Sequence, residues 1–313
     1  MPRSARLLSF PVVMTAIFAA QVGLHASDLK PEEIVSRHLD SIAPAATRAA
    51  AKSRVVQGTL KFRVPVGGGG EVAGTWGRVS SEGKSAFVMR FGASNWRGEQ
   101  FTFDGSKTGF AAATSSHQRS EFAQFISSQD YIIKEGLLGG EYSVAWALSR
   151  LDENHARVQS LSRKKVHGHE LVGLQYFSKG TSDMQVKMYF DPETFHHVLT
   201  IYSMSIAPNM KGDVTGSPSQ KETRYTLEEQ FDDFKTTEGV TLPTSYRLQW
   251  TEEVPDQGTS QASGASAVTQ QGQMVNNDSL STGTGRTLVF DWEMTVTGLR
   301  DNIPLDDGNF RVK

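Results

Sequence analysis

Histidine pairs are the residues of this chain whose spacing could support metal binding. His167 and His169 flank a glycine, and a His-x-His pair on a strand points both imidazoles to one face, as zinc ligands require. The intervening Gly168 marks a turn, however, and no acidic residue lies at ligand spacing beside this pair or beside the adjacent His196 and His197. We therefore expect exposed turn histidines, and we predict no metal site.

Glycine and carboxylate clusters could bind phosphate or exchange protons. The glycines at residues 67–70 lack the following helix and Lys-Ser or Lys-Thr pair of a phosphate-binding loop, so they predict a hairpin turn. The pairs at residues 228–229 and 232–233 put one carboxylate on each face of a strand, which favours solvation and protection of a sheet edge. No serine lies in a Gly-x-Ser-x-Gly motif. We expect a protein that is not an enzyme and has no cofactor.

The N-terminus has the pattern of a secretory signal peptide, predicted over residues 1–26. Arg3 and Arg6 precede an apolar stretch at residues 7–20, and Ala26 ends a plausible cleavage site. The apolar stretch is short compared with the roughly 20 residues of a membrane span. We expect a periplasmic or otherwise exported protein that is soluble after cleavage. A retained membrane anchor is the alternative interpretation.

Charge and cysteine content narrow the classes of partner. The chain has no cysteine, so it has neither disulfides nor a thiolate metal site, and its stability must come from its core. The roughly 287 residues left after cleavage are enough to bury a hydrophobic core. The formal net charge of −2 becomes about −4 once the two N-terminal arginines are removed. Such a charge gives no reason to expect binding to nucleic acid or to an anionic membrane.

Eleven or twelve segments alternate apolar and polar residues, which predicts strands with one buried face. The clearest is residues 184–190, where Met184, Val186, Met188 and Phe190 share one side. Such segments occur on both sides of one helical block. We therefore predict a mainly β, single-domain structure over residues 27–313, built on one large curved antiparallel sheet whose concave side must be filled or covered.

Two segments show helical spacing, and one shows no apolar pattern. A helix is predicted from Pro31, and a helical insertion at about residues 115–154 carries an apolar face that indicates a position over the sheet. Residues 255–285 are rich in Gly, Ser, Thr, Gln and Asn. They predict a disordered loop between two strands.

Four local sequences, in this order, resemble the outer-membrane lipoprotein-sorting family, the LolA-like half-barrels. They are the turn at residues 103–105 (FDG), the turn at 190–195 (FDPETF), the strand end at 234–243 (FKTTEGVTLP) and the close of the chain at 302–310 (NIPLDDGNF). The resemblance implies about eleven antiparallel strands forming an incomplete barrel, with helices over its mouth and an apolar cavity for acyl chains. The family's lid-fastening arginine cannot be assigned here, because Arg63, Arg78 and Arg90 all lie on candidate strands.

The expected function is that of a periplasmic carrier or sensor that binds acyl chains, lipids or lipidated proteins. The block would open about Gly136, Gly139 and Gly140. The predicted binding wall consists of Leu60, Phe62, Trp76, Phe87, Met89, Phe91, Phe101, Phe103, Met184, Met188, Leu248, Trp250, Phe290 and Trp292. The predicted lid residues are Phe122, Phe125, Ile126, Trp146 and Leu148.

Two other functions fit the same pattern. One is a structural or protein-binding envelope module whose concave face is simply filled by its own side chains. The other is a lipid-responsive envelope-stress sensor that reports to an envelope membrane protein. Burial of side chains in an ordinary core would account for every apolar residue of the predicted wall.

Overall fold

The computed structural model describes residues 29–66, 70–92, 96–114, 119–166, 168–180, 182–206, 222–255 and 285–312. The predicted signal peptide, nearly all of the loop at residues 255–285, most of the glycine turn at residues 67–70 and His167 lie outside these ranges.

Twelve strands form a single sheet in the described residues. They are β1 (Ser53–Val66), β2 (Val72–Ser81), β3 (Lys84–Phe91), β4 (Trp96–Phe103), β5 (Thr108–Thr114), β6 (Arg157–Val166), β7 (His169–Phe177), β8 (Gln185–Phe190), β9 (His197–Ile206), β10 (Thr223–Thr237), β11 (Val240–Val254) and β12 (Arg286–Asp301). The helices are α1 (Pro31–Ile42), α2 (Ala45–Ala50), α3 (Glu121–Ser128) and α4 (Tyr131–Lys134). Three short 3₁₀ turns are η2 (Gly140–Tyr142), η3 (Ala147–Arg150) and η4 (Asp307–Phe310).

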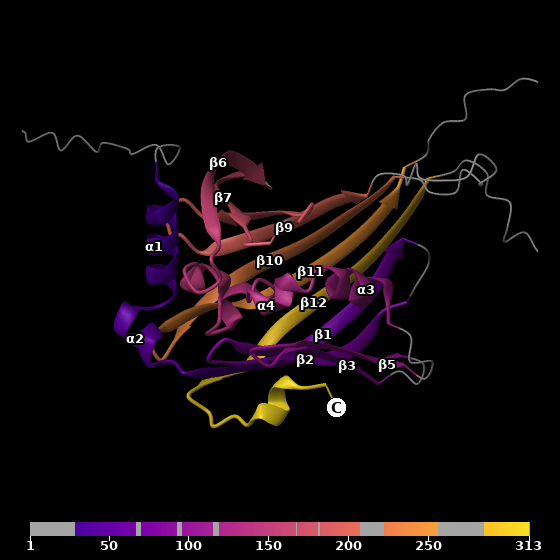
Figure 1. Cartoon of the computed structure of the whole chain (residues 1–313), viewed down its shortest axis with the longest axis horizontal. Coiled ribbons are helices and arrows are strands. Elements are labelled where there is room, and N and C mark those ends of the chain that lie inside the picture. The colour runs from indigo at the N-terminus through magenta and orange to yellow at the C-terminus, as the bar shows by residue number, and fades with distance from the viewer. Residues whose placement is uncertain are drawn as a thin grey trace, which may run out of the picture.

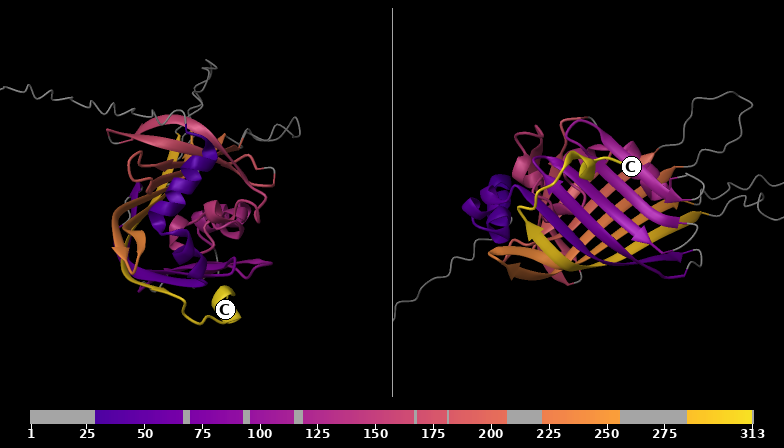
Figure 2. Two further views of the ribbon diagram at one scale, coloured as in Figure 1. Left: turned by 90° about the vertical axis from the view of Figure 1, so that its left-hand side faces the viewer. Right: turned by 90° about the horizontal axis from the view of Figure 1, so that it is seen from below.

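The sheet is antiparallel and open. Its strand order is β5-β4-β3-β2-β1-β12-β11-β10-β9-β8-β7-β6. Every pair of neighbouring strands is consecutive in the chain except β1 and β12, the first and the last strand. The strands curve into a trough, seen end-on in the left panel of Figure 2. The predicted mainly β, incomplete barrel is confirmed, with twelve strands.

This topology forces the helical block across the trough. β5 and β6 are consecutive in the chain but occupy opposite edges of the sheet. The connection between them therefore has to span the sheet. It carries α3, α4, η2 and η3, which lie inside the trough (Figure 1 and Figure 2). α1 lies at one end of the trough and contacts β6, β11 and η3. The predicted place of the helical insertion is thus confirmed.

The alternation of residue types determines which side chains fill the trough. In β1, Leu60 and Phe62 are buried while Lys61 between them is exposed. The row predicted at residues 184–190 is buried likewise, with exposed fractions of 6% or less. One hydrophobic core joins these rows to the helical block. A second, small cluster of Leu171, Tyr189 and Leu199 lies outside that core.

The block is shorter in its helices than the sequence pattern suggests, because glycines with positive φ interrupt it. Gly136 has φ of +74°, and a Cβ there would lie 1.9 Å from the Ala145 carbonyl oxygen. Gly139 has φ of +73°. Such conformations are open mainly to glycine. Gly136 follows the end of α4 and Gly139 directly precedes η2, so the two glycines separate these helical pieces.

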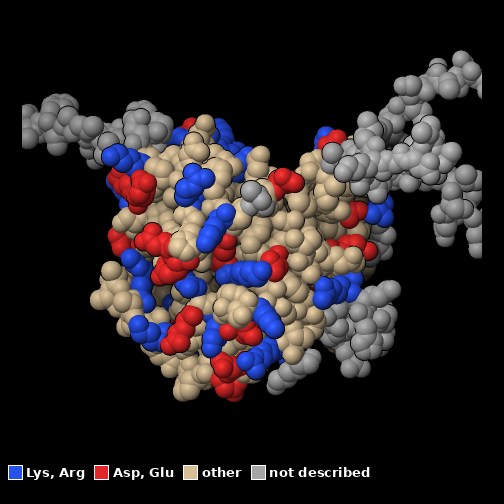
Figure 3. All heavy atoms as spheres, in the orientation of Figure 1, with Lys and Arg blue, Asp and Glu red and all other residues tan. Residues whose placement is uncertain are grey.

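None of the helices in the described part of the chain is long and apolar enough to cross a membrane. The face drawn in Figure 3 carries basic and acidic side chains side by side, in line with the near-neutral charge of the chain.

Candidate functional site

The predicted wall residues lie together on the concave face. Twelve of the fourteen are buried, and all of these belong to the main core; Phe103 and Phe290 are partly buried and pack against it. Strand register brings residues from distant parts of the chain into contact. Phe62 of β1 pairs with Trp292 of β12, which pairs on its other side with Leu248 of β11.

Aromatic rings form a continuous floor across these strands. The ring centroids of Phe62 and Trp292 are 5.3 Å apart, and those of Trp250 and Phe290 are also 5.3 Å apart. Phe87 and Phe101 stack at 6.4 Å. Their side chains therefore form one apolar surface along the trough.

The predicted lid residues cover this floor. Phe122 of α3 contacts Trp292 with centroids 4.7 Å apart, and Phe125 lies 6.3 Å from Trp250. Ile126, Trp146 and Leu148 are also buried in the main core. The structure thus brings wall and lid together, and their role in ligand binding stays a prediction.

Two cavities lie away from this floor. A groove of about 1030 Å³ has apolar residues from β7 and β9, including Leu171 and Leu199, between charged side chains of β6, β10 and β12. A second cavity of about 570 Å³ lies between α2, the β2–β3 turn and the end of the helical block. The described residues contain no group of three or more His, Asp or Glu side chains placed to hold a metal ion.

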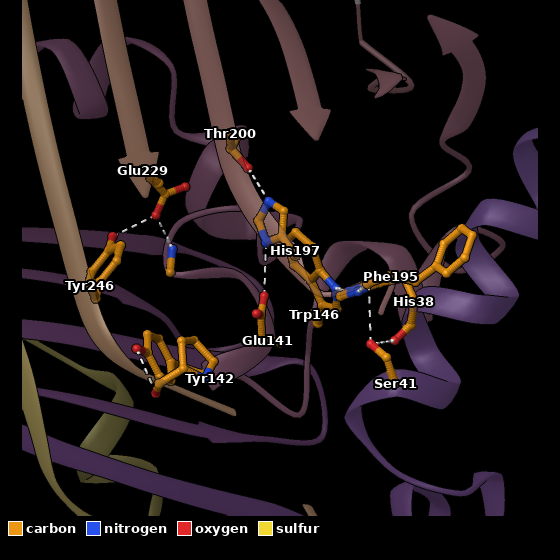
Figure 4. A network of polar contacts seen from close by, with 12 residues as sticks. His38, Ser41, Glu141, Tyr142, Trp146, Phe195, His197, Thr200, Glu229 and Tyr246 are labelled. Atoms are coloured by element: carbon orange, nitrogen blue, oxygen red, sulfur yellow. Dashed lines mark hydrogen bonds and ion pairs between the residues drawn. The ribbon is translucent and has the colours of Figure 1, made fainter. Parts of the chain in front are cut away.

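Residues 137–146 of the block are held by buried polar groups, and we call them the clamped segment. Arg78 of β2 donates from Nη1 to the Leu138 carbonyl, and Glu229 of β10 accepts from the Gly139 N–H at 2.6 Å. These two backbone groups belong to the same peptide bond. Tyr202 and Tyr246 each donate to the Glu229 carboxylate at 2.6 Å. One peptide group is therefore gripped by side chains of β2 and β10. Figure 4 shows Glu229 with Tyr246.

Both gripping side chains are removed from water. Burial raises the pKa of Glu229 and lowers the pKa of Arg78. The sequence pattern predicted solvation or edge protection for Glu229, and this was wrong, because Glu229 is fully buried. The sequence did contain a signal that was missed. Glu229 lies two residues from the buried Leu227 and Phe231, so it shares their face of the strand. Arg78 shares a face with the buried Trp76 in the same way.

A second polar network fixes the other end of the clamped segment. Glu141 contacts His197 Nδ1 at 2.9 Å, and His197 Nε2 contacts the Thr200 hydroxyl at 2.7 Å. Arg54 donates to the Glu141 carbonyl at 3.0 Å and to Asp301 at 2.7 Å. Burial acts to raise the pKa of Glu141. The nearby His197 acts in the opposite direction, and the pKa of Glu141 lies below its usual value.

His38 of α1 joins this network through tryptophan. Trp146 Nε1 donates to His38 Nε2 at 2.9 Å, so His38 Nδ1 carries the proton that reaches the Phe195 carbonyl at 3.1 Å. This arrangement requires a neutral imidazole. Burial lowers the pKa of His38 to about 4.

The histidine prediction was wrong for His197, which is fully buried, while His169 is exposed as expected. The order Glu141, His197, Thr200 matches that of a hydrolytic relay, in which a histidine activates a hydroxyl. Thr200 is fully buried, however, so no substrate reaches its hydroxyl in this conformation. The network therefore positions the clamped segment.

The first part of the block is attached differently, and we call residues 119–130 the α3 cover. Ser120 caps α3 by accepting from the Ala123 N–H at 3.0 Å, and its hydroxyl donates to Glu99 of β4. Glu99 is 2% exposed, its Oε2 has no partner, and burial raises its pKa to about 7. Beyond this contact, α3 meets the sheet through Phe122, Ala123, Phe125 and Ile126.

Comparisons with known proteins gave structural matches only. No family model and no curated protein matches the chain. A LolA superfamily protein, NE2245 from Nitrosomonas europaea, matches with a TM-score of 0.44 and 12% identity, over 91% of this chain and 98% of that one. An outer membrane lipoprotein-sorting protein domain, described as putative, from Vibrio parahaemolyticus matches at 0.44 and 10%, over 88% and 95%. A DUF1329 family protein from Desulfovibrio piger matches at 0.37 and 9%, over 90% and 96%.

With TM-scores of 0.44 or less, the link to LolA-like proteins stays the resemblance that the four local sequences indicate. Identities this low transfer no residue roles. The roles assigned to side chains of this chain come from their own contacts.

Proposed function

We propose that this protein is a non-enzymatic binder or carrier of acyl chains in the cell envelope, with lipids or lipidated proteins as ligands. The observation that carries the proposal is the cover of the aromatic floor. The α3 cover rests on Trp250 and Trp292 through apolar side chains, and one carboxylate, Glu99, ties its first residues to the sheet. An acyl chain offers the same apolar contacts and can take the place of α3.

The energies of cover and ligand are comparable. α3 buries Phe122, Phe125 and Ile126, and full burial of such side chains contributes about 1.5–3 kcal/mol each. Lifting α3 therefore costs roughly 5–9 kcal/mol before any relaxation. An acyl chain contributes about 0.8 kcal/mol per buried CH₂, so about ten buried methylenes offset that cost.

The direct test is mass spectrometry of lipid extracted from the protein after purification without detergent. We expect acyl lipid to copurify. A protein that carries no acyl lipid and never enhances the fluorescence of an apolar probe would contradict the proposal.

Two substitutions of equal burial locate the site. Met184 lies in the main core and is 6% exposed, whereas Leu199 lies in the separate small cluster and is 5% exposed. Met184→Asp should reduce lipid occupancy, and Leu199→Asp should leave it unchanged. Circular dichroism is the check that both variants are folded. Equal occupancy in the two variants would exclude the concave face as the site.

A protein-binding module is the second candidate, and the 1030 Å³ groove favours it. Its apolar residues lie between basic Lys164 and Lys165 on β6 and acidic Glu228 and Asp232 on β10. A bound protein segment could use both signs of charge. Leu199→Asp separates the two candidates, because it should abolish capture of a protein partner while lipid occupancy stays unchanged.

A further inference from the structure

Two tryptophans under the α3 cover have polar groups with no partner. The indole N–H groups of Trp250 and Trp292 make no hydrogen bond, although both side chains are fully buried. A buried N–H without an acceptor is destabilising, because it has lost its bond to water. Trp146 in the same core does have an acceptor, His38 Nε2.

These indoles lie close together beneath one helix. Trp250 is opposite Phe290 and Trp292 is opposite Leu248, so the indoles are diagonal neighbours on adjacent strands. Phe122 covers Trp292 and Phe125 covers Trp250. α3 lies over β11, β12 and β1 in Figure 1. Removal of this one helix would therefore uncover both donors.

The contacts also indicate which part of the block can move. The clamped segment is held by Arg78, Glu229 and Arg54 through buried hydrogen bonds. α3 ends at Ser128, and the next residue, Gln129, has φ of −118° and ψ of 48° before α4 begins. A break at Gln129 lies upstream of Gly136, Gly139 and Gly140, which the sequence favoured as the hinge.

We infer that α3 swings away from the sheet and that Trp250 and Trp292 then donate hydrogen bonds to the carbonyl oxygen of an ester-linked or amide-linked acyl chain. This inference rests on the proposed acyl-binding function and adds the recognised group. The floor binds the hydrocarbon chain, and the indoles select a chain that carries a carbonyl. An alkyl ether of equal length lacks that acceptor.

A matched pair of ligands tests the inference. Monododecanoylglycerol and 1-O-dodecylglycerol have the same chain and head group, and only the first has a carbonyl. We expect the wild-type protein to bind the ester about tenfold more tightly by isothermal titration calorimetry, equivalent to about 1.4 kcal/mol. The double variant Trp250→Phe/Trp292→Phe keeps aromatic rings but loses both donors, so it should bind the two ligands equally.

Tyr189→Phe is the control variant. Tyr189 is buried in the small cluster outside the main core, so this variant loses a polar group while the concave face keeps both indole donors. It should keep the tenfold preference. Equal binding of ester and ether by the wild type would overturn the inference while leaving acyl binding intact. Failure of both ligands to bind would overturn the proposed function as well.

The carbonyl occurs both in glycerolipids and in N-acylated proteins, and a third ligand distinguishes these sources. An N-dodecanoylated dipeptide amide represents the protein source. Whichever carbonyl ligand binds more tightly identifies the source, and either result supports the inference when the ether is weaker than both. A preference of the double variant for the carbonyl ligands as large as that of the wild type would contradict it.

Discussion

Two parts of the covering block, the clamped segment and the α3 cover, are attached to the same sheet by different kinds of interaction. Buried charges grip the clamped segment: Arg78 and Glu229 hold the Leu138–Gly139 peptide, and Glu141 joins His197. Residues 119–128 of the α3 cover rely on apolar side chains and on Glu99. The end of the cover stays tied to the sheet, because Thr108 donates to Asp130 and Gln129 donates to Met204. Apolar contacts are non-directional and can be exchanged for those of a ligand, whereas a buried charge that loses its partner is strongly destabilised. The α3 cover is therefore the part of the block that is suited to move.

The largest effect should come from breaking the grip on the clamped segment. Arg78→Met removes the donor to the Leu138 carbonyl and leaves Glu229 buried without a nearby positive charge. We expect the free energy of unfolding to fall by about 3–5 kcal/mol in urea denaturation. Arg63→Met is the control, because the Arg63 side chain is 38% exposed and its partner Asp291 keeps Arg247. Equal losses in the two variants would contradict the grip.

Acid should weaken the clamped segment through His38. Its pKa is about 4 in the folded protein and 6.5 ordinarily, so the unfolded chain binds the extra proton first as the pH falls. Stability is full above pH 6.5 and is lost towards pH 4, by about 3 kcal/mol for this group. Urea denaturation at pH 6.5 and 4.5 measures the loss. The variant His38→Gln should show a shallower dependence, and an unchanged slope would argue against this role of His38.

Alkali should weaken the α3 cover through Glu99, with the opposite sign. The pKa of Glu99 is about 7 in the closed protein and 4.5 ordinarily, so the closed form keeps its proton to higher pH. The closed state is therefore favoured below pH 4.5 and loses up to about 3 kcal/mol as the pH rises through 7. Hydrogen exchange of α3 amides, corrected for intrinsic rates, should accelerate from pH 5 to 8. Glu99→Gln should remove that acceleration. Equal acceleration in both proteins would exclude Glu99 as the cause.

The smallest effect is expected from the helix cap. Ser120→Ala removes the acceptor for the Ala123 N–H and the donor to Glu99, and loss of such a cap costs about 1 kcal/mol. Amides of α3 should then exchange about fivefold faster, while amides of the clamped segment keep their rates. Equal acceleration in both segments would show that the block opens as one unit.

The wall of the trough was predictable from the sequence because alternation reports which side of a strand is buried. Phe62, Met188 and Trp292 are buried in the main core, on the face that their alternation indicates. The crossing of the block was predictable for the same reason, since its apolar face had to lie over the sheet.

The polar groups were not predictable, because their partners are distant in the chain. Arg78 meets Leu138 sixty residues away, and Glu141 meets His197 at a separation of fifty-six. Their position in phase with buried apolar residues was the one signal in the sequence. A polar residue in that position belongs to the buried face of its strand. Its partner can be identified only from the folded structure.

Thiol labelling tests the central claim, that α3 opens while the clamped segment stays in place. The chain has no cysteine, so single substitutions report one position each. Ala123 of α3 is 1% exposed and Ala147, at the start of η3 next to the clamped segment, is 0% exposed. We predict that monododecanoylglycerol accelerates maleimide labelling of the Ala123→Cys variant and leaves that of Ala147→Cys unchanged. Equal acceleration at both positions, or acceleration at neither, would contradict the account.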